Sequence, residues 1–318
     1  MNKDLRIIFL GTPAFAVESL DILVKNKYTI VGVITAPDKP AGRGQKLQQS
    51  AVKEFALLHG LTVLQPEKLK DPEFIQDLQE LNADLQIVVA FRMLPEIIWN
   101  MPRLGTFNLH ASLLPQYRGA APINWAIING EKKTGVTTFF LQNEIDTGKI
   151  IFSEKTAIHK NETAGELHDR LMELGSDLVL KTVRAIEEGD YPQATQDETI
   201  ETKHAPKLRK EDGRINWSKN IYDIHNFIRG LSPYPTAWTE LVSPAGDIYN
   251  MKIFHSVILI DKYIHPSNIV LTDTKNHIKI AVEGGYIFIT ELQLAGKKRM
   301  TVEEYLRGYK LNGEWKVV

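Results

Sequence analysis

The chain has 318 residues, of which 43% are hydrophobic and 24% charged, and its formal net charge is −1. This length allows two domains, and the balanced charge means that any nucleic-acid site must be a local patch. The absence of cysteine excludes disulfides, thiolate metal sites and a cysteine nucleophile. The sequence has neither a hydrophobic signal core at its start nor an apolar run long enough to span a bilayer, so we expect a cytoplasmic location.

The first half of the chain alternates predicted strands and helices. Residues 5–10 and 28–34 have the pattern of buried strands, and residues 14–23 between them that of a helix. This order predicts a doubly wound, mostly parallel α/β sheet of Rossmann-like type. The turn at Gly11 lacks the second and third glycines of a dinucleotide-binding turn, which disfavours a nicotinamide oxidoreductase. Further strands are expected at 62–64, 84–90, 105–110, 136–141 and 149–158, and helices at 50–59, 71–81, 122–129 and 163–189.

The pattern changes after residue 189. Residues 190–206 have no clear periodicity and indicate a linker. Short strands separated by turn residues then predict a small β-barrel, at 238–241, 248–255, 268–271, 277–281 and 286–292, with helices at 221–229 and 302–306. We therefore expect a first domain at 1–189, a linker at 190–206 and a second domain at 207–318.

The most informative stretch is residues 107–122, in which a predicted strand runs into a loop rich in small residues and proline. Asn108 and His110 are two residues apart, so on a strand their side chains share one face. An amide and an imidazole at a strand end can polarise a carbonyl oxygen and move a proton. Taken alone, the pair favours the plainer interpretation, in which Asn108 is a strand-end turn former and His110 a core histidine.

A second polar stretch changes that weighing. Residues 134–137 read T-G-V-T, and Asp146 opens a D-T-G triplet after the following strand. Together with N-L-H-x-S-L-L-P-x-Y-R-G-A-A-P at 108–122, these motifs resemble the folate-dependent formyltransferases, and in particular the members that act on tRNA. The resemblance extends along nearly the whole chain, and the central motif is highly specific.

The resemblance implies that a formyl group passes from 10-formyltetrahydrofolate to the α-amino group of initiator methionyl-tRNA, for translation initiation. Asn108 and His110 would donate hydrogen bonds to the developing oxyanion, and Asp146 would hold His110 in a productive protonation state. The residues near this motif form no ligand cluster, and the folate supplies an activated formyl group, so no metal is expected. We expect a monomer.

The resemblance also implies substrate contacts. Leu94 and the loop of Ser112, Leu113, Leu114 and Pro115 would line the folate pocket, although Leu113 and Leu114 fit plain core packing as well. Arg92 and Leu94 match a folate-contacting Arg-x-Leu of the glycinamide ribonucleotide formyltransferases; Tyr-Gly is commoner at Phe91-Arg92 among tRNA-acting members, so the pterin packing stays open.

Contacts to tRNA are expected from three basic segments, each of which could also be simple solvated surface. The first is an exposed loop at 35–46, which matches an inserted loop typical of the tRNA-acting members. The other two follow the linker and precede the last helix, in a barrel that resembles an oligonucleotide-binding domain. The residues are Gly42, Arg43, Lys46, Lys207, Arg209, Lys297 and Lys298.

Two kinds of alternative remain. A formyltransferase that acts on a nucleotide-sugar amine, or a formyltetrahydrofolate hydrolase domain, would share the chemistry but would lack a use for the loop around Arg43. A non-catalytic RNA-binding protein would have no need of the Asn108, His110 and Asp146 set.

Overall fold

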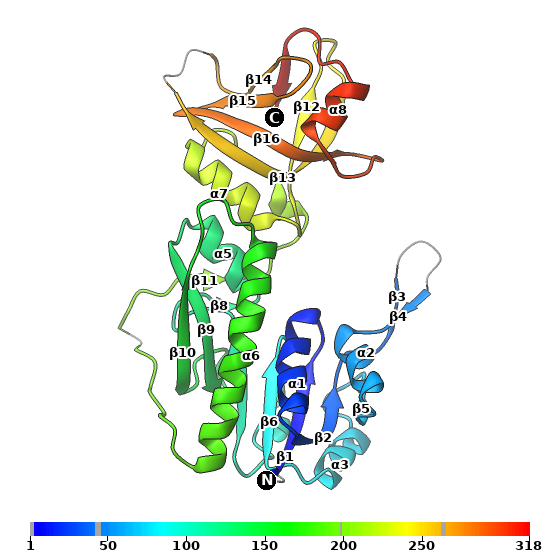
Figure 1. Cartoon of the computed structure of the whole chain (residues 1–318), viewed down its shortest axis with the longest axis vertical. Coiled ribbons are helices and arrows are strands. Elements are labelled where there is room, and N and C mark those ends of the chain that lie inside the picture. The colour runs from blue at the N-terminus through cyan, green and yellow to red at the C-terminus, as the bar shows by residue number, and fades with distance from the viewer. Residues whose placement is uncertain (1–2, 42–45, 198, 262–264) are drawn as a thin grey trace. The chain divides into compact units, whose positions relative to one another are not determined.

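The computed structural model describes residues 3–41, 46–197, 199–261 and 265–318 (Figure 1). The chain divides into two compact units, neither of which is continuous in sequence. Residues 1–119, 135–156 and 168–204 form the first, the sheet unit, and residues 120–134, 157–167 and 205–318 form the second, the barrel unit. The assignment of a catalytic domain to 1–189, a linker to 190–206 and a tRNA-binding domain to 207–318 stays a prediction.

The sheet unit is built on a seven-stranded sheet with the order β10-β9-β7-β6-β1-β2-β5. The strands are β1 (Lys3–Gly11), β2 (Tyr28–Ile34), β5 (Val63–Leu64), β6 (Leu85–Val89), β7 (Thr106–His110), β9 (Lys133–Phe140) and β10 (Ile150–Ala157). Strand β1 pairs in parallel with β2 and β6, and β6 with β7, whereas β7 and β9 are antiparallel. The predicted doubly wound sheet is confirmed. The chain runs outward from β1 to β5 and returns to β6, so the ligand crevice is expected at the carboxyl ends of these central strands.

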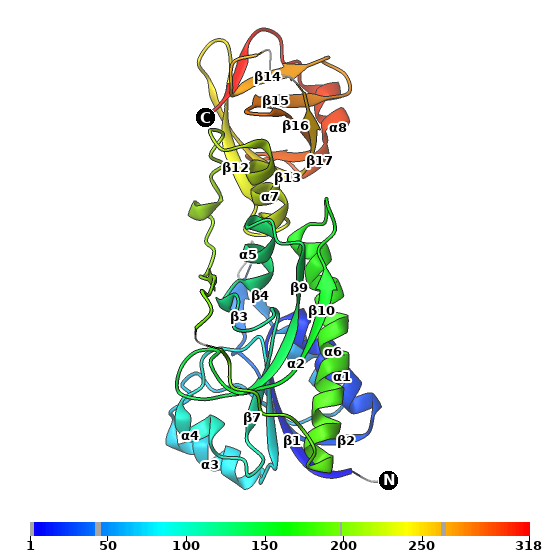
Figure 2. The same ribbon diagram turned by 90° about the vertical axis from the view of Figure 1, so that its left-hand side faces the viewer.

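Helices cover both faces of this sheet. They are α1 (Ala14–Lys25), α2 (Ala51–Leu58), α3 (Pro72–Glu80), α4 (Glu96–Trp99) and α6 (Ala164–Glu188). Figure 2 shows α1 and α6 on one face and α3 and α4 on the other. The predicted capping box of α6 is present, since Thr163 Oγ1 accepts from the Glu166 amide and Glu166 accepts from the Thr163 amide. Phe9, Phe107 and Phe139 are fully buried in the core.

The prediction of a plain exposed loop over residues 35–46 is wrong. Strand β3 (Lys39–Ala41) pairs with β4 (Lys46–Gln48) in an antiparallel hairpin. Three-residue strands are too short to show an alternating pattern in the sequence. Residues 42–45 lie outside the described part of the chain.

The barrel unit contains a closed antiparallel barrel, as expected, but with one more strand than predicted. Its strands are β12 (Ala237–Val242), β13 (Ile248–Ile260), β14 (Ile269–Thr272), β15 (Ile278–Val282), β16 (Gly285–Leu294) and β18 (Trp315–Val317). The sixth, β18, lies between β12 and β14, and β13 pairs with β16 to close the sheet. Three residues at the chain end carry too little pattern to be recognised as a strand. Smaller elements of the barrel unit are α5 (Pro122–Ile128), η1 (Glu211–Gly213), α7 (Ile221–Leu231), β17 (Met300–Thr301) and α8 (Val302–Gly308). Elsewhere in the chain, β8 (Arg118–Gly119) pairs with β11 (His204–Ala205).

None of the helices in the described part of the chain combines the length and the apolar character needed to cross a membrane.

Candidate active site

The carboxyl end of β7 carries the first two predicted catalytic residues. Asn108 lies opposite Phe139 of β9, and His110 lies opposite Thr137, so both side chains leave the same face of the strand. Asn108 Oδ1 is buried and has no hydrogen-bond partner among the described residues. A buried polar atom without a partner is costly, and such atoms in native structures commonly belong to ligand sites. The amide therefore suits a ligand at this strand end.

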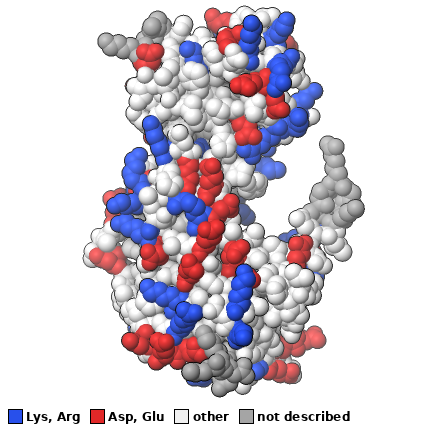
Figure 3. Space-filling view, in the orientation of Figure 1, with Lys and Arg blue, Asp and Glu red and all other residues white. Residues whose placement is uncertain are grey.

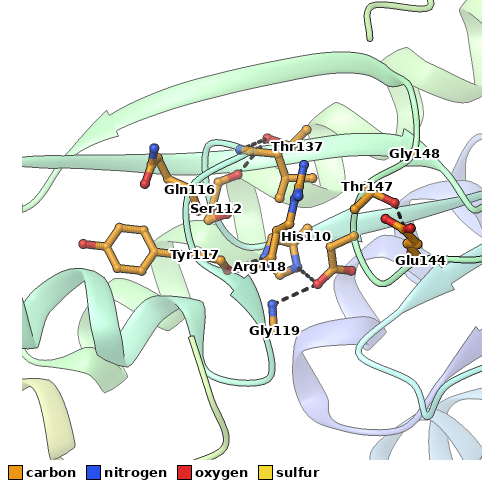
Figure 4. A network of polar contacts seen from close by, with 12 residues as sticks. His110, Ser112, Gln116, Tyr117, Arg118, Gly119, Thr137, Glu144, Thr147 and Gly148 are labelled. Carbon is orange, nitrogen blue, oxygen red and sulfur yellow. Dashed lines mark hydrogen bonds and ion pairs between the residues drawn. The ribbon is translucent and has the colours of Figure 1, made fainter. Parts of the chain in front are cut away.

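His110 is held between two groups of the sheet unit (Figure 4). Its Nε2 lies 2.9 Å from the carbonyl oxygen of Tyr117, and its Nδ1 lies 3.9 Å from Asp146 Oδ2. A carbonyl oxygen can only accept, so Nε2 carries a proton and donates it. The nitrogen that is left to gain or lose a proton is Nδ1, which faces the carboxylate. The structure thus brings His110 and Asp146 together, as the sequence predicted, at ion-pair rather than hydrogen-bond distance.

The loop after β9 presents Asp146 in a constrained conformation. Asp146 has a φ of +56°, in the left-handed region that few side chains adopt. Its Oδ2 accepts a hydrogen bond of 2.9 Å from the backbone amide of Gly119. Gly148 passes so close to β9 that a Cβ there would lie 1.6 Å from the Phe140 carbonyl oxygen. The D-T-G triplet therefore combines a carboxylate with the glycine that this close approach requires.

The loop from Ser112 to Pro115 follows β7 directly and is tied to β9. Thr137 Oγ1 donates to the Ser112 carbonyl at 2.7 Å and accepts from the Leu114 amide at 3.3 Å. Ser112 is fully buried and its hydroxyl donates to the Gln116 carbonyl. Leu114 is buried, whereas Leu113 and Pro115 are half-buried. The T-G-V-T motif thus fixes the loop that is predicted to contact folate.

The two other predicted folate residues lie after β6. Leu94 is buried in a cluster with Leu10, Val88 and residues of α3 and α4, so it packs in the core. Arg92 is exposed, and its guanidinium donates to the backbone carbonyls of Pro66 and Glu67.

The predicted tRNA residues are spread over the chain. Gly42 and Arg43 lie outside the described residues, and Lys46 pairs with Ala41 through the backbone of the β3–β4 hairpin. In the barrel unit, Lys207, Arg209, Lys297 and Lys298 are all exposed. Figure 3 shows Lys and Arg side chains, with acidic ones among them, gathered over the side of the barrel unit that carries α8.

Comparison with known proteins identifies the family of this site. The profile described as "Formyl transferase" matches residues 5–183, and that described as "Formyl transferase, C-terminal domain" matches residues 207–310. The chain belongs to the formyltransferase family.

Relatives in this family match over almost the full length. The chain is 56% identical to a methionyl-tRNA formyltransferase of Bacteroides thetaiotaomicron, which covers 99% of both chains. It is 55% identical to the methionyl-tRNA formyltransferase of Flavobacterium johnsoniae, again over 99% of both.

Solved structures of other proteins share the fold. The sugar 3N-formyltransferase WlaRD, solved in the presence of dTDP and 5-N-formyl-THF, matches with a TM-score of 0.67 and 24% identity over 92% of this chain and 99% of its own. HypX from Aquifex aeolicus, solved with tetrahydrofolic acid, matches with a TM-score of 0.62 and 18% identity over 95% of this chain and 47% of its own.

The described part of this formyltransferase contains no group of three or more His, Cys, Asp or Glu side chains that could hold a metal ion.

Proposed function

We propose that this chain transfers the formyl group of 10-formyltetrahydrofolate to the α-amino group of initiator methionyl-tRNA and so supplies formylmethionyl-tRNA for translation initiation. The observation that carries this proposal is the 55–56% identity, over 99% of the chain, to methionyl-tRNA formyltransferases. The folate is the formyl donor. Transfer breaks the bond between the formyl carbon and the folate nitrogen and forms one to the amine of methionine.

Asn108 is the proposed oxyanion donor. When an amine attacks the formyl carbon, the formyl oxygen becomes an oxyanion, and the amide NH2 of Asn108 stabilises it by hydrogen bonding. The buried Oδ1, which has no partner among the described residues, can only accept, and it is proposed to receive a hydrogen bond from the attacking amine while the NH2 donates to the oxyanion. His110 is the second proposed donor. Its Nε2 proton is bound to Tyr117, so donation from that nitrogen would require the bond to exchange.

His110 and Asp146 are proposed to manage the proton that the attacking amine loses. Nδ1 of His110 is the position that can take up a proton, and the resulting imidazolium would lie opposite the Asp146 carboxylate at 3.9 Å. The Gly119 amide holds that carboxylate in place. The proton is finally returned to the folate nitrogen, which leaves tetrahydrofolate as the second product.

The remaining residues bind the two substrates. The loop from Ser112 to Pro115, together with Leu94 and Arg92, is proposed to receive the folate. The basic residues Arg43 with Gly42, Lys46, Lys207, Arg209, Lys297 and Lys298 are proposed to contact tRNA phosphates. Since its acceptor is a charged tRNA and the chain has no cysteine, we place the reaction in the cytoplasm, and we expect the enzyme to act as a monomer.

The rival within the family is a sugar formyltransferase. The sugar 3N-formyltransferase named above matches at 24% identity, which shows the fold alone, whereas the tRNA enzymes match at 55–56%. The decisive experiment is a formylation assay that offers purified enzyme and 10-formyltetrahydrofolate a panel of acceptors. We expect turnover with charged initiator tRNA and none with amino-sugar nucleotides; the reverse result would contradict the proposal. Light scattering on the same sample measures the oligomeric state.

A further inference from the structure

A buried glutamine outside the sequence motifs reaches the loop of Asp146. Gln196 lies in the aperiodic segment after α6, yet only 4% of it is exposed. Its Nε2 donates to the carbonyl oxygens of Asp146 at 2.8 Å and Gly148 at 2.9 Å. All these residues belong to the sheet unit. The side chain therefore binds the backbone on both sides of Thr147.

The other end of the same amide is also occupied. Gln196 Oε1 accepts from Nη2 of Arg118 at 2.6 Å and from its Nε at 3.2 Å. Arg118 directly precedes Gly119, whose amide binds the Asp146 carboxylate. One amide thus connects the two chain segments that determine where this carboxylate lies. Its donors hold the Asp146 backbone, and its acceptor holds the neighbour of the group that orients the carboxylate.

The backbone around Gln196 is itself anchored. Ala194 and Ile150 exchange two hydrogen bonds, of 2.8 and 2.9 Å, at the start of β10. This pairing places the segment beside the loop that ends at Gly148. Asp146 has a left-handed backbone, which relaxes unless surrounding contacts determine it. The two carbonyl bonds from Gln196 are such contacts.

We infer that Gln196 is a positioning residue, which holds Asp146 at its working distance from His110. The inference rests on the proposed function, since that function gives the pair its catalytic role. A displacement of about 1 Å in a positioned group can cost on the order of 10²-fold in rate. Loss of Gln196 should therefore lower kcat by roughly tenfold to hundredfold, with KM for both substrates changed little.

Two variants of Gln196 and one matched control test this. Gln196→Met keeps the size of the side chain and removes all four hydrogen bonds, whereas Gln196→Glu keeps the acceptor for Arg118 and removes the donors to the carbonyls. Both should lower kcat. Gln193 is in the same segment but exposed, and Gln193→Met should behave as wild type. Thermal unfolding of each variant verifies that the protein assayed is folded, and Gln196→Glu serves if Gln196→Met does not fold.

A double-mutant cycle separates positioning from a general structural effect. If Gln196 acts through Asp146, Gln196→Met should lower kcat in the wild-type background but not further in Asp146→Ala. An equal loss in both backgrounds, or full activity of Gln196→Met, would overturn the inference.

A measurement without substrate distinguishes failure of the inference from failure of the proposed function. The NMR chemical shifts of the His110 imidazole should change in Gln196→Met, because the neighbouring carboxylate moves, and stay unchanged in Gln193→Met. If wild-type enzyme formylates no methionyl-tRNA but these shifts change, the proposed function fails and the positioning role stands. If methionyl-tRNA is formylated and the shifts are the same in all three proteins, the inference fails alone.

Discussion

At the scale of single residues, the side chains of the site are held in nearly fixed positions. His110 has one ring nitrogen bound to a backbone carbonyl, and the side chains of His110 and Asp146 are only 8% and 11% exposed. Asp146 is oriented by a backbone amide, which cannot rotate away as a side chain can. Groups held in this way need no reorganisation when charge develops, which is the main source of electrostatic catalysis.

The first prediction concerns this pair. His110→Ala and Asp146→Ala should each lower kcat by about 10²–10⁴-fold, the usual loss for a positioned acid–base group. The measurement is steady-state formylation of methionyl-tRNA, with circular dichroism as a check on folding. His168→Ala is a control of the same residue type, since that imidazole is 37% exposed and lies on α6. Near-normal turnover in a folded variant would remove that residue from the mechanism.

At the scale of elements, β9 holds the loop that follows β7. Thr137 makes two hydrogen bonds to this loop, and the neighbouring Thr138, equally buried, bonds instead to Thr182 of α6. Successive residues of a strand point to opposite faces of the sheet. Thr137 therefore anchors the loop on one face, whereas Thr138 packs against α6 on the other.

The second prediction uses this difference. Thr137→Val should weaken folate binding by up to about thirtyfold, because it removes two hydrogen bonds to the loop, each worth about 1 kcal/mol. Thr138→Val should leave folate affinity unchanged. Equilibrium titration with a folate analogue measures both. Equal effects in the two variants, or a crystal with the analogue bound away from residues 112–115, would contradict the assignment of this loop.

The third prediction concerns α7 of the barrel unit. Burial, and after it the positive charge of Arg229, lower the pKa of His225 from 6.5 to about 4. The folded protein therefore keeps this imidazole neutral while the unfolded chain takes up a proton, so stability falls as the pH drops from about 6.5 towards 4. Wild-type protein should lose free energy of unfolding between pH 7 and pH 5, and His225→Gln should reduce this loss by about 2 kcal/mol.

Chemical denaturation at the two pH values measures this effect. His204→Gln, at an exposed position, is the control and should reproduce the wild-type pH dependence. If His225→Gln loses as much stability as wild type on acidification, this histidine is not the group that titrates.

At the scale of the whole molecule, the net charge does not explain how the protein binds RNA. The formal balance of −1 gives no general attraction to RNA, so tRNA must be held by local basic segments. Arg43, Lys207 and Lys297 belong to three such segments that are far apart in the sequence. Contacts spread in this way position a nucleic acid without reading its bases.

The fourth prediction tests one of these segments. Arg43→Ala should weaken use of methionyl-tRNA and reduce the salt dependence of tRNA binding by about one phosphate contact. Folate affinity should be nearly unchanged. The experiment compares tRNA affinity against salt concentration in the two proteins. A strong shift in folate affinity with an unaltered salt slope would show that Arg43 acts on folate and not on tRNA.

Much of this protein is determined by local sequence. The apolar strand of residues 5–10, the Asp-Pro start of α3 and the Thr163–Glu166 capping box each define an element through residues within one or two turns. That Asn108 and His110 share one face of β7 also follows from their spacing on a strand. These predictions succeeded because hydrophobic periodicity and capping depend on near neighbours alone.

The tertiary structure decided the rest, because it depends on residues far apart in the chain. The hydrogen bonds of Gln196 join it to residues 48, 50 and 78 positions away, and no local pattern marks a polar residue in an aperiodic segment. The closing strand β18 is recognisable only once β12 and β14 are in place beside it. The approach of Asp146 to His110 likewise needs Gly148 against Phe140 and Gly119 against the carboxylate. Sequence motifs can identify such residues as candidates, but only the packing of the sheet brings them close to one another.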